Sequence, residues 1–585
     1  MTDILFINPT QKLSIKNEVN GTMLLATKLL QADFSVQILR FGQIETDPKD
    51  YASFIREIVG QILKIAPKCV SFYTLWPYYH IMLRIASEIK KADPNIAVVF
   101  GGPQASATAK DTMSAMPFVD YICTGEGENT TVPFFSELLR VECPNLSKIP
   151  GLYYRKGTDV IFNDIPMPLC NLETLPYWDE RLYLDAYKES AEVLRSNNFF
   201  MPIDAGRGCP YSCTFCCTSY FWKRIYRLKS PKRIVEDIKY YHNKFGINSF
   251  WFSHDAFTVD KKLVYAICDE LERNNLNIRW RCTSRIDCLT EELILKMKNA
   301  GLVEIELGIE TGSPRMQKII NKNLNLKKAE QTISFLLNNG LRVGLFFMYG
   351  FPEETEDDLN QTLELLLTSL DLGVKHATMS FCKFYPTTDI TERFIDDLVL
   401  SPEAKFLYRG IDGYHEELPM IQANKSLFPF FYTLHTPTRD NYHFVFMLEW
   451  VYQKFPRFAR YVRKLYNGNN LQFYHDFISA NQHIFDQDIT LITNYYSHSS
   501  FEMLSRVLDR FDLPYIPMLK EALRFEGDIN KVYNSNEDIT LCETYGFNFI
   551  DSKLNLPIEQ YSQGKTTISL QKTNGKMSTK ILNIE

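Results

Sequence analysis

Short apolar runs alternate with longer amphipathic stretches over roughly the first 145 residues. The short runs have the length of strands, and in the longer stretches apolar residues recur at helical spacing. The predicted strands cover residues 4–9, 36–41, 69–75 and 96–102, and the predicted helices cover residues 21–32, 51–66, 80–92 and 131–140. Because strands that alternate with helices are typical of βαβ units, we predict a doubly wound parallel sheet in an α/β domain over residues 1–145. Ligands of such sheets bind outside the carboxyl ends of the strands.

The alternation stops at about residue 146 and restarts near Phe199. Residues 146–196 show little periodicity and contain several prolines, so they are predicted to be a linker. Over residues 197–390 six further strands are predicted, each but the last followed by a helical pattern. These strands lie near residues 199–205, 249–253, 279–283, 303–308, 343–348 and 377–382. Six βα repeats indicate a partial barrel rather than a complete barrel of eight.

The pattern changes again after about residue 390. Long helical stretches such as residues 444–466 are followed by strand-like runs at the end of the chain. Two of these runs flank Asn574-Gly575, and Asn-Gly is the strongest short hairpin pattern. Residues 391–585 are therefore predicted to form a mainly helical region that ends in a β-hairpin. This region carries no motif that assigns a role, so a substrate-recognition module, for example for a peptide, and a lid over the incomplete barrel both stay open.

Composition narrows the class of protein. A chain of 585 residues is too long for one hydrophobic core, and 45% apolar with 23% charged residues is ordinary for a globular protein. The net charge of −6 argues against a general nucleic-acid binder. We find neither an apolar run that could span a bilayer nor a signal peptide. The 13 cysteines, an odd number, do not fit a secreted disulfide framework, so a cytoplasmic location is expected.

One cysteine motif carries the chemistry. The segment GRGCPYSCTFCC (206–217) places Cys209, Cys213 and Cys216 at CxxxCxxC spacing, directly after a predicted strand. Most 4Fe–4S clusters use four cysteines, so three thiolates on one loop leave the fourth iron open for a substrate, as catalytic zinc sites do. A structural zinc site would need a fourth ligand at partner spacing, and Cys217 is too close to Cys216 to supply it. We therefore predict a 4Fe–4S cluster on the three cysteines, with Cys217 as a buried small residue.

This motif at the start of a predicted barrel resembles the radical S-adenosylmethionine (SAM) superfamily. The resemblance implies that the amino and carboxylate groups of SAM chelate the open iron. An electron from the cluster then cleaves SAM to methionine and a 5′-deoxyadenosyl radical, while the protein orients the reactants and excludes water. The resemblance also implies an electron donor of the flavodoxin or ferredoxin type.

The strand ends that follow the cysteine motif also resemble the family and imply residues that bind SAM. Asp255, in FSHDAFT, would meet the amino group of SAM, although a turn or helix-cap role is equally open. Arg285, in CTSRID, would pair with a carboxylate, since its fork suits bidentate pairing. In LGIETGS, Gly308 would let the backbone approach, and Glu310 would accept hydrogen bonds from the ribose or fix the methionyl end. Thr387 stands where relatives often have glycine, which leaves the role of the last strand open.

The N-terminal domain, placed before such a barrel, resembles the cobalamin-binding domain of class B radical SAM enzymes. The matching segments are SFYT (71–74), FGGPQAS (100–106) and TGEGE (124–128). The resemblance implies that two glycines let the chain pass close to the nucleotide tail and that three hydroxyl groups bond its dimethylbenzimidazole or phosphate groups. These implied cobalamin-binding residues are Gly101, Gly102, Ser71, Thr74 and Ser106.

The motif Asp-x-His-x-x-Gly, whose histidine ligates cobalt in many cobalamin domains, is missing from this chain. The first 145 residues contain a single histidine, His80, which we interpret as a packing residue. No histidine is therefore predicted beneath cobalt. A vestigial domain that binds no corrin stays open.

Together these resemblances imply a cobalamin-dependent radical SAM methyltransferase that acts on an unactivated carbon. The substrate, a small molecule or a peptide, is not written in the sequence. Two alternatives stay open: a non-methylating cyclase or rearrangement enzyme, and a cluster-bearing redox or sensor module without turnover of its own. No catalytic residue beyond the cofactor-binding ones is predicted.

Overall fold

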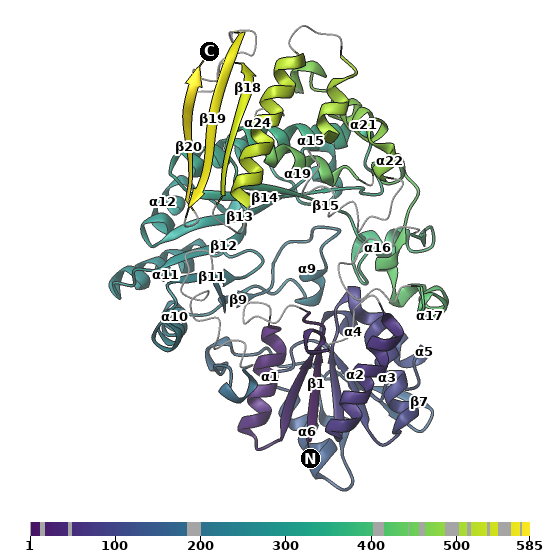
Figure 1. The fold of residues 1–585 in the computed structure, drawn as a ribbon. Helices are drawn as coiled ribbons and strands as arrows, with labels where there is room; N and C mark the ends of the chain where they lie inside the picture. Colours follow the sequence, from purple (N-terminus) through teal and green to yellow (C-terminus); the bar gives the residue numbers. More distant parts are fainter. Residues whose placement is uncertain are drawn as a thin grey trace. The chain divides into compact units, whose positions relative to one another are not determined.

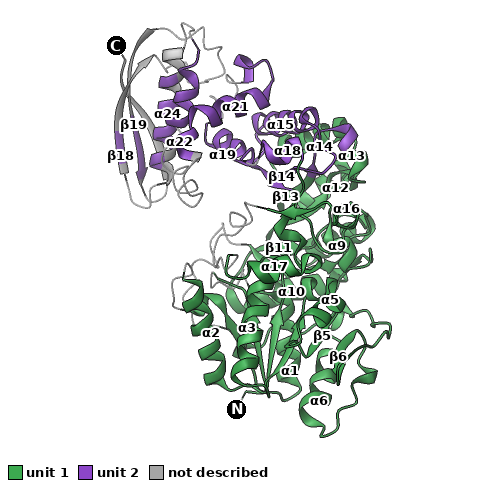
Figure 2. Cartoon of the chain, turned by 90° about the vertical axis from the view of Figure 1, so that its right-hand side faces the viewer, with its two compact units in different colours: residues 1–308, 317–342, 382–435 green, residues 309–316, 343–381, 436–585 purple. Residues whose placement is uncertain are grey.

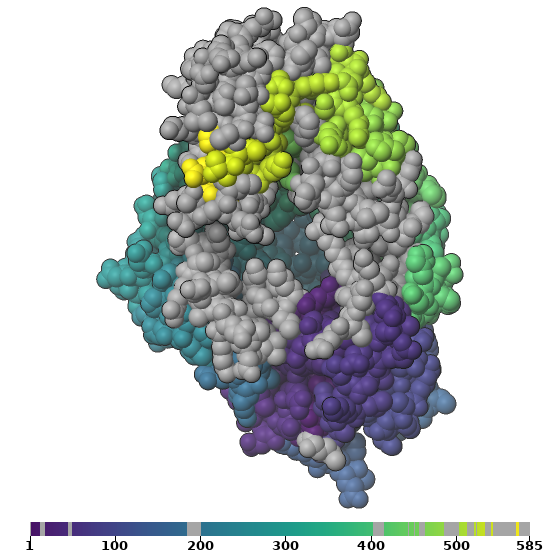
Figure 3. Space-filling model, viewed as in Figure 1, coloured from purple at the N-terminus to yellow at the C-terminus, as the bar shows by residue number. Residues whose placement is uncertain are grey.

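The computed structural model describes most of the chain and divides it into two compact units (Figure 2). Unit 1 comprises residues 1–308, 317–342 and 382–435, and unit 2 comprises residues 309–316, 343–381 and 436–585. The described residues are 2–11, 18–44, 50–183, 200–401, 415–442, 444–455, 463–485, 502–511, 516–534, 539–547, 563–573 and 576–584. Figure 3 shows the same face as Figure 1 in space-filling form, with the remaining residues in grey. Within the described ranges, no helix combines the length and the apolar character that a membrane crossing requires.

The N-terminal sheet of unit 1 has seven strands in the order β2-β1-β3-β4-β5-β6-β7 (Figure 1). The strands are β1 (Ile4–Asn8), β2 (Val36–Arg40), β3 (Cys69–Tyr73), β4 (Ala97–Gly101), β5 (Tyr121–Cys123), β6 (Leu152–Lys156) and β7 (Asp159–Phe162). The first five pair in parallel, as predicted. Because the strand order reverses between β1 and β3, the sheet has a topological switch point there, which is where doubly wound sheets bind ligands.

Helices cover both faces of this sheet. The four longest are α1 (Asn20–Gln31), α2 (Tyr51–Ile65), α3 (Tyr79–Ala92) and α6 (Thr131–Arg140). Helix α1 packs with α6, and α2 packs with α3. Right-handed crossovers on the two sides of the switch point place these pairs on opposite faces. All five residues of β1 are buried, as expected for a parallel strand with helices on both sides.

Two strands lie where the sequence predicted only a linker. Strands β6 and β7 pair antiparallel with each other, and β6 pairs antiparallel with β5. Apart from the buried Leu152, their residues are half-buried or exposed at the edge of the sheet, so they lack the continuous apolar run of the inner strands. A search for strong apolar periodicity therefore missed them. The sheet continues past residue 145, while the full set of domain boundaries stays a prediction.

All six predicted barrel strands are present. In unit 1, β8 (Met201–Asp204), β11 (Ser249–Ser253), β12 (Arg279–Arg285) and β13 (Leu302–Glu310, up to Gly308) pair in parallel in that order. In unit 2, β14 (Arg342–Tyr349, from Val343) pairs in parallel with β15 (His376–Phe381). The intervening helices are α10 (Pro231–Phe245), α11 (Lys261–Arg273), α12 (Glu291–Asn299), α13 (Pro314–Ile319), α14 (Leu326–Asn338) and α15 (Glu356–Asp371).

Shorter elements connect these layers. They are α4 (Pro103–Ala107), α5 (Ala109–Ala115), β9 (Gly206–Arg207), α9 (Cys217–Phe221), β10 (Arg227–Leu228), α16 (Asp389–Phe394), β16 (Val399–Leu400), α17 (Leu418–Ala423), β17 (Tyr432–Thr433) and α18 (Pro437–Asp440). Strands β9 and β10 form a two-stranded antiparallel ladder. This ladder encloses the cysteine segment, because β9 precedes it and β10 follows α9.

The C-terminal part of unit 2 is mainly helical and ends in an antiparallel sheet. Its elements are α19 (Phe446–Lys454), α21 (Asn470–Ala480), α22 (Gln482–Phe485), α24 (Ile516–Asn534), β18 (Ile539–Phe547), β19 (Gln563–Thr573) and β20 (Lys576–Ile584). The predicted hairpin is confirmed by the pairing of β19 with β20, although its turn residues Asn574 and Gly575 lie outside the described residues. The single helix predicted over residues 444–466 is wrong, since α19 ends at Lys454. The next residue, Phe455, precedes a proline and is therefore disfavoured in helical conformation.

Helix α19 supplies hydrogen bonds to strand β15. The Glu449 carboxylate accepts from the backbone N–H of Met379. One helical turn later, the Gln453 side-chain amide donates to the carbonyl of Ala377 at 3.2 Å. Side chains of this helix thus satisfy backbone groups of β15. Left unpaired, these groups would offer a template for pairing with a strand of another chain.

Candidate functional site

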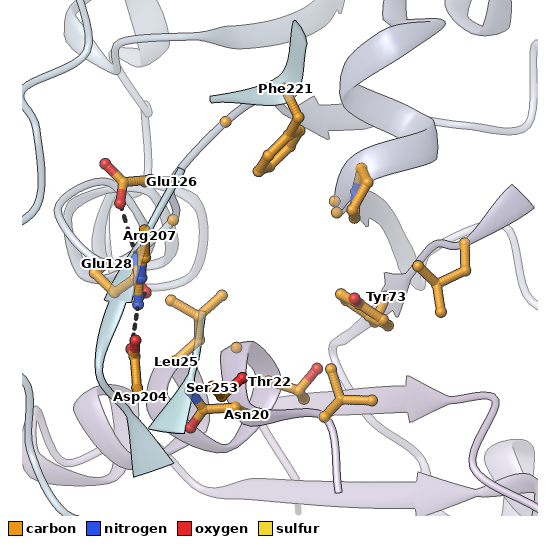
Figure 4. Close-up of a pocket in the computed structure, with 18 of the residues that line it drawn as sticks. Asn20, Thr22, Leu25, Tyr73, Glu126, Glu128, Asp204, Arg207, Phe221 and Ser253 are labelled. Carbon is orange, nitrogen blue, oxygen red and sulfur yellow. Dashed lines mark hydrogen bonds and ion pairs between the residues drawn. The ribbon is translucent and has the colours of Figure 1, made fainter. Parts of the chain in front are cut away.

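A cavity of about 650 Å³ lies in unit 1 at the carboxyl ends of the N-terminal strands. Its lining includes Phe6 at β1, Phe72 at β3 and Gly101 at β4, so it sits at the switch point of the sheet. The other wall comes from the ends of barrel strands, including Asp204 on β8 and Ser253 on β11. Figure 4 shows the cavity between these walls. One space therefore adjoins both the N-terminal sheet and the barrel strands of the same unit.

Four of the predicted cofactor-binding residues line this cavity: Ser71, Gly101, Gly102 and Asp255. Gly102 has a φ of +95° and a ψ of −178°, a backbone conformation that is essentially restricted to glycine. A Cβ atom at this position would also lie 3.0 Å from the carbonyl oxygen of Thr74. The requirement for glycine here is therefore set by the turn itself.

Thr74 and Ser106 support the cavity wall instead of lining it. Thr74 is fully buried, and its hydroxyl donates to the Gly101 carbonyl at 2.8 Å and accepts from the Ala105 N–H at 2.9 Å. The Ser106 hydroxyl accepts from the Gly125 N–H at 3.0 Å. These hydrogen bonds fix the turn after β4 and hold the TGEGE segment beside it. The predicted contact of these two hydroxyl groups with a nucleotide tail stays untested.

The three motif cysteines lie on the loop between β9 and α9, and their thiols interact electrostatically. Burial, together with the neighbouring thiols of Cys216 and Cys213, raises the pKa of the Cys209 thiol to about 11. Within the described part of the chain, no three histidine, cysteine or acidic side chains converge as ligands of one metal ion. A cubane does not require such convergence, because each thiolate ligates a different iron. Three neighbouring thiols on one loop therefore fit a 4Fe–4S cluster.

Several hydrogen bonds hold the cysteine loop from outside. The Asn321 amide donates to the Ser212 carbonyl at 3.1 Å and to its hydroxyl at 2.9 Å. The Thr214 N–H donates to the Ile320 carbonyl at 3.0 Å, and the Thr214 carbonyl accepts from Ile390 at 3.1 Å. Partners distant in sequence thus fix the loop before any cluster binds. Cys217, next to the loop, begins α9 and is half-buried, and burial raises its pKa to about 12.

Asp255 joins the cysteine loop to the cavity. Asp255 follows β11, and its side chain lines the cavity. Partial loss of water around the carboxyl group raises its pKa. After burial and the neighbouring thiols, the Asp255 carboxylate also contributes to the raised pKa of Cys209 and Cys217. A carboxylate that faces the cavity beside the cluster loop is suited to bind a cationic amino group.

A buried ion-pair network that the sequence analysis missed forms one wall of the cavity (Figure 4). Arg207, on β9, lies 2.8 Å from Glu126, 2.6 Å from Glu128 and 3.3 Å from Asp204. Arg227, on β10, shares Glu126 at 2.8 Å. The glutamates belong to the TGEGE segment, so the network ties the N-terminal sheet to the ladder that encloses the cysteine loop. Glu126 and Glu128 in TGEGE and Arg207 in the cysteine motif were all visible in the sequence. Their pairing could be seen only in the fold.

A neutral histidine also lines the cavity. Burial lowers the pKa of His254 to about 4, and its Nδ1 accepts from the Ala256 N–H at 2.9 Å. By contrast, His80 is buried in α3 and packs edge-on against Phe431, with 5.0 Å between ring centroids. His80 is not among the residues that line the cavity, which agrees with its interpretation as a packing residue.

Three predicted SAM-binding residues lie outside the cavity lining: Arg285, Gly308 and Glu310. Arg285 is only 6% exposed and pairs with Asp287. Gly308 ends the part of β13 that belongs to unit 1, whereas Glu310 belongs to unit 2. Glu310 is buried and has a φ of +68°, a strained value for a residue with a side chain. The predicted roles of these residues stay untested.

Comparisons with known proteins give matches for both the barrel strands and the N-terminal sheet that border the cavity. The sequence model of the radical SAM superfamily matches residues 203–366, and that of the B12 binding domain matches residues 17–134. An uncharacterised methyltransferase from Pyrococcus horikoshii is 27% identical over 406 residues, which cover 68% of this chain and 84% of that protein. The anaerobic magnesium-protoporphyrin IX monomethyl ester cyclase of Rubrivivax gelatinosus is 24% identical over 319 residues, 53% of this chain and 56% of that protein.

Two solved structures share the fold at low sequence identity. TsrM from Kitasatospora setae, a radical SAM methyltransferase solved with cobalamin and a 4Fe–4S cluster, has a TM-score of 0.55 and 15% identity, covering 69% of this chain and 81% of that chain. The cobalamin-dependent radical SAM enzyme OxsB, solved with aqua-cobalamin and SAM, also has a TM-score of 0.55, with 14% identity, covering 92% of this chain and 82% of that chain.

The fold and the site define a radical SAM protein whose barrel follows a B12-binding sheet. The chain thus combines a radical SAM domain with a B12-binding domain, the domain combination of cobalamin-dependent radical SAM enzymes. Its cofactors are accordingly a 4Fe–4S cluster, SAM and cobalamin. The predicted fold class is confirmed in the N-terminal sheet, the barrel strands and the mainly helical C-terminal region.

Proposed function

We propose that this protein is a cobalamin-dependent radical SAM methyltransferase. The observation that carries the proposal is the cavity in unit 1, which adjoins the strand ends of the B12-binding sheet and, through Asp255, the cysteine loop. A methyl group carried by cobalamin and a substrate radical made from SAM need a common space of this kind. The similar proteins include a hopanoid C-3 methylase and a cytidylyl-2-hydroxyethylphosphonate methyltransferase, which supports a methylating reaction.

The residues of the chain have the following proposed roles. Cys209, Cys213 and Cys216 would hold the cluster, which would supply the electron for the reductive cleavage of SAM. Asp255 would bind the amino group of SAM, and Gly308 of the same unit would let the backbone approach SAM closely. The strand ends would hold the cobalamin tail, and Gly102 would form the turn that borders this part of the cavity. Ser71 and Gly101 line its path, while Thr74 and Ser106 fix the turns beside it.

A second candidate is a non-methylating cyclase or rearrangement reaction. The observation that favours it is the match to anaerobic magnesium-protoporphyrin IX monomethyl ester cyclases from three bacteria, each 24% identical to this chain. The two reactions use SAM differently. A methyltransferase takes the methyl group from one SAM and cleaves another, whereas a cyclase of this kind only cleaves SAM.

Product analysis distinguishes these functions. The cluster-reconstituted, cobalamin-loaded protein is reduced anaerobically with SAM, and both adenosyl products are quantified by liquid chromatography and mass spectrometry. We expect S-adenosylhomocysteine, which forms when SAM gives up its methyl group, together with 5′-deoxyadenosine, which forms on reductive cleavage. 5′-Deoxyadenosine alone would favour the cyclase class, and neither product would favour a redox or sensor module.

Two further properties belong to the proposal. A one-electron donor of the flavodoxin or ferredoxin type reduces the cluster, because a 4Fe–4S cluster exchanges one electron at a time. The protein works in the cytoplasm on a small-molecule or peptide substrate. Reduction by purified flavodoxin in place of a chemical reductant tests the donor class directly.

A further inference from the structure

Arg285 is held away from the cavity by four partners. Its guanidinium forms a bidentate pair with Asp287, with Nε–Oδ1 and Nη2–Oδ2 distances of 3.0 and 2.9 Å. Nη2 also donates to the Lys322 carbonyl at 2.8 Å, and Nη1 donates to the Cys213 sulfur at 3.6 Å. The plane of the guanidinium lies 3.7 Å from the ring centre of Tyr211. All five residues belong to unit 1.

These contacts converge on the cysteine loop. Tyr211 and Cys213 both lie in the loop, and the Tyr211 hydroxyl is 3.1 Å from the sulfur of Cys288 on the segment after β12. Lys322 lies in the turn that also anchors Ser212 through Asn321. Arg285 therefore joins β12, this turn and the loop with one rigid, permanently charged group.

We infer that Arg285 is a positioning residue that sets the reduction potential of the cluster through Cys213. This inference rests on the proposed function, because it requires the cluster on the three cysteines. Hydrogen bonds to the sulfurs, net charge and solvent exposure are the means by which a protein adjusts the potential of an iron–sulfur cluster. Arg285 supplies the first two and is 6% exposed, so solvent screens its charge only weakly.

The direction of the effect follows from charge. Reduction adds one electron to the cluster, and a cation that donates an N–H to a ligand sulfur stabilises the more negative, reduced form. Arg285 therefore makes the cluster easier to reduce. Asp287 acts in the opposite direction, since its carboxylate, 38% exposed, offsets part of the charge of Arg285. The two residues have opposite effects on the potential, which a purely structural role would not produce.

The test measures the midpoint potential of the reconstituted cluster by redox titration followed by electron paramagnetic resonance, after iron and sulfide have been counted in each variant. In Arg285→Met we expect the ratio of reduced to oxidised cluster at a fixed potential to fall about tenfold, which is about 59 mV for a one-electron couple. In Asp287→Asn the ratio is expected to rise. Arg285→Lys, which keeps the charge but not the fork, is expected to lie between Arg285→Met and the wild type.

Each outcome decides the inference. An unchanged or raised potential in Arg285→Met, with full iron and sulfide content, would overturn it, as would a potential that falls equally in both the Arg285→Met and Asp287→Asn variants. If Arg285→Met loads no cluster, the sign of the change in Asp287→Asn decides, and a potential that does not rise there counts against the inference. Failure of the wild type to load a cluster would instead contradict the proposed function.

Discussion

The buried network around Arg207 makes a quantitative prediction about stability. Its side chain is 9% exposed, and within the described residues it is the one ion-pair partner of Glu128, whose side chain is 5% exposed. Arg207→Met removes the cation and leaves the Glu128 carboxylate buried without a counter-charge. Breaking one partner of a buried pair costs about 3–5 kcal/mol. We expect the free energy of unfolding of unit 1 to fall by that amount.

A matched control separates burial from ion pairing as such. Arg181 pairs with Asp179 at 2.6 Å, the distance between Arg207 and Glu128, but Arg181 is 63% exposed. An exposed pair contributes less than about 1 kcal/mol, so Arg181→Met should be nearly silent. The assay is urea-induced unfolding of the cofactor-free protein followed by circular dichroism. Equal losses in Arg207→Met and Arg181→Met would refute the reasoning.

Three further predictions concern the cofactors and pH. Gly102→Ala should strain the backbone by about 1–3 kcal/mol and weaken cobalamin binding in a spectral titration, whereas Gly60→Ala, on α2 and with nothing within 4 Å of its added Cβ, should bind normally; equal affinities would refute this. Asp255→Asn should weaken SAM binding by 10- to 100-fold, since a hydrogen bond to a charged group contributes about 1.5–3 kcal/mol, with cluster absorbance unchanged; unaltered SAM affinity by calorimetry would contradict the assignment. Burial raises the pKa of Glu449 from 4.5 to about 8. The contribution of this side chain to the stability of the folded state is therefore fully present below pH 4.5. It is lost at about 1.4 kcal/mol per pH unit as pH rises toward 8. Glu449→Gln should remove that slope in unfolding measured at several pH values, and an unchanged slope would show that Glu449 is not its source.

Much of the fold could be predicted because parallel strands buried on both sides leave an unmistakable pattern. Strand β1 is apolar at four of its five positions and completely buried. The barrel strands are less uniform, since strands such as β8 and β12 alternate buried with half-buried residues, but the helical stretches between them marked their places. Strands β6 and β7 could not be predicted in this way, because an edge hairpin needs only a half-apolar sequence. The end of α19 was missed because apolar periodicity outweighed the proline that follows Phe455.

The candidate site divides in a similar way. The cysteine motif and Asp255 could be singled out from the sequence because each lies in a short recognisable segment, and their roles stay predictions. The role of Arg207 was not, since its partners lie about 80 residues earlier in the chain and only the fold brings them together. Arg285 was recognised as a carboxylate partner, but the sequence did not show that Asp287, two residues later, would occupy its fork.

The central claim is that Cys209, Cys213 and Cys216 hold a cluster that cleaves SAM. Its most direct test is to measure iron, sulfide and 5′-deoxyadenosine together in anaerobically reconstituted protein. The wild type and Cys217→Ala should each bind about four irons and four sulfides and produce 5′-deoxyadenosine under reducing conditions. Replacing Cys209, Cys213 and Cys216 together with alanine should abolish both. A cluster that survives in the triple variant, or one that is lost in Cys217→Ala, would contradict the account.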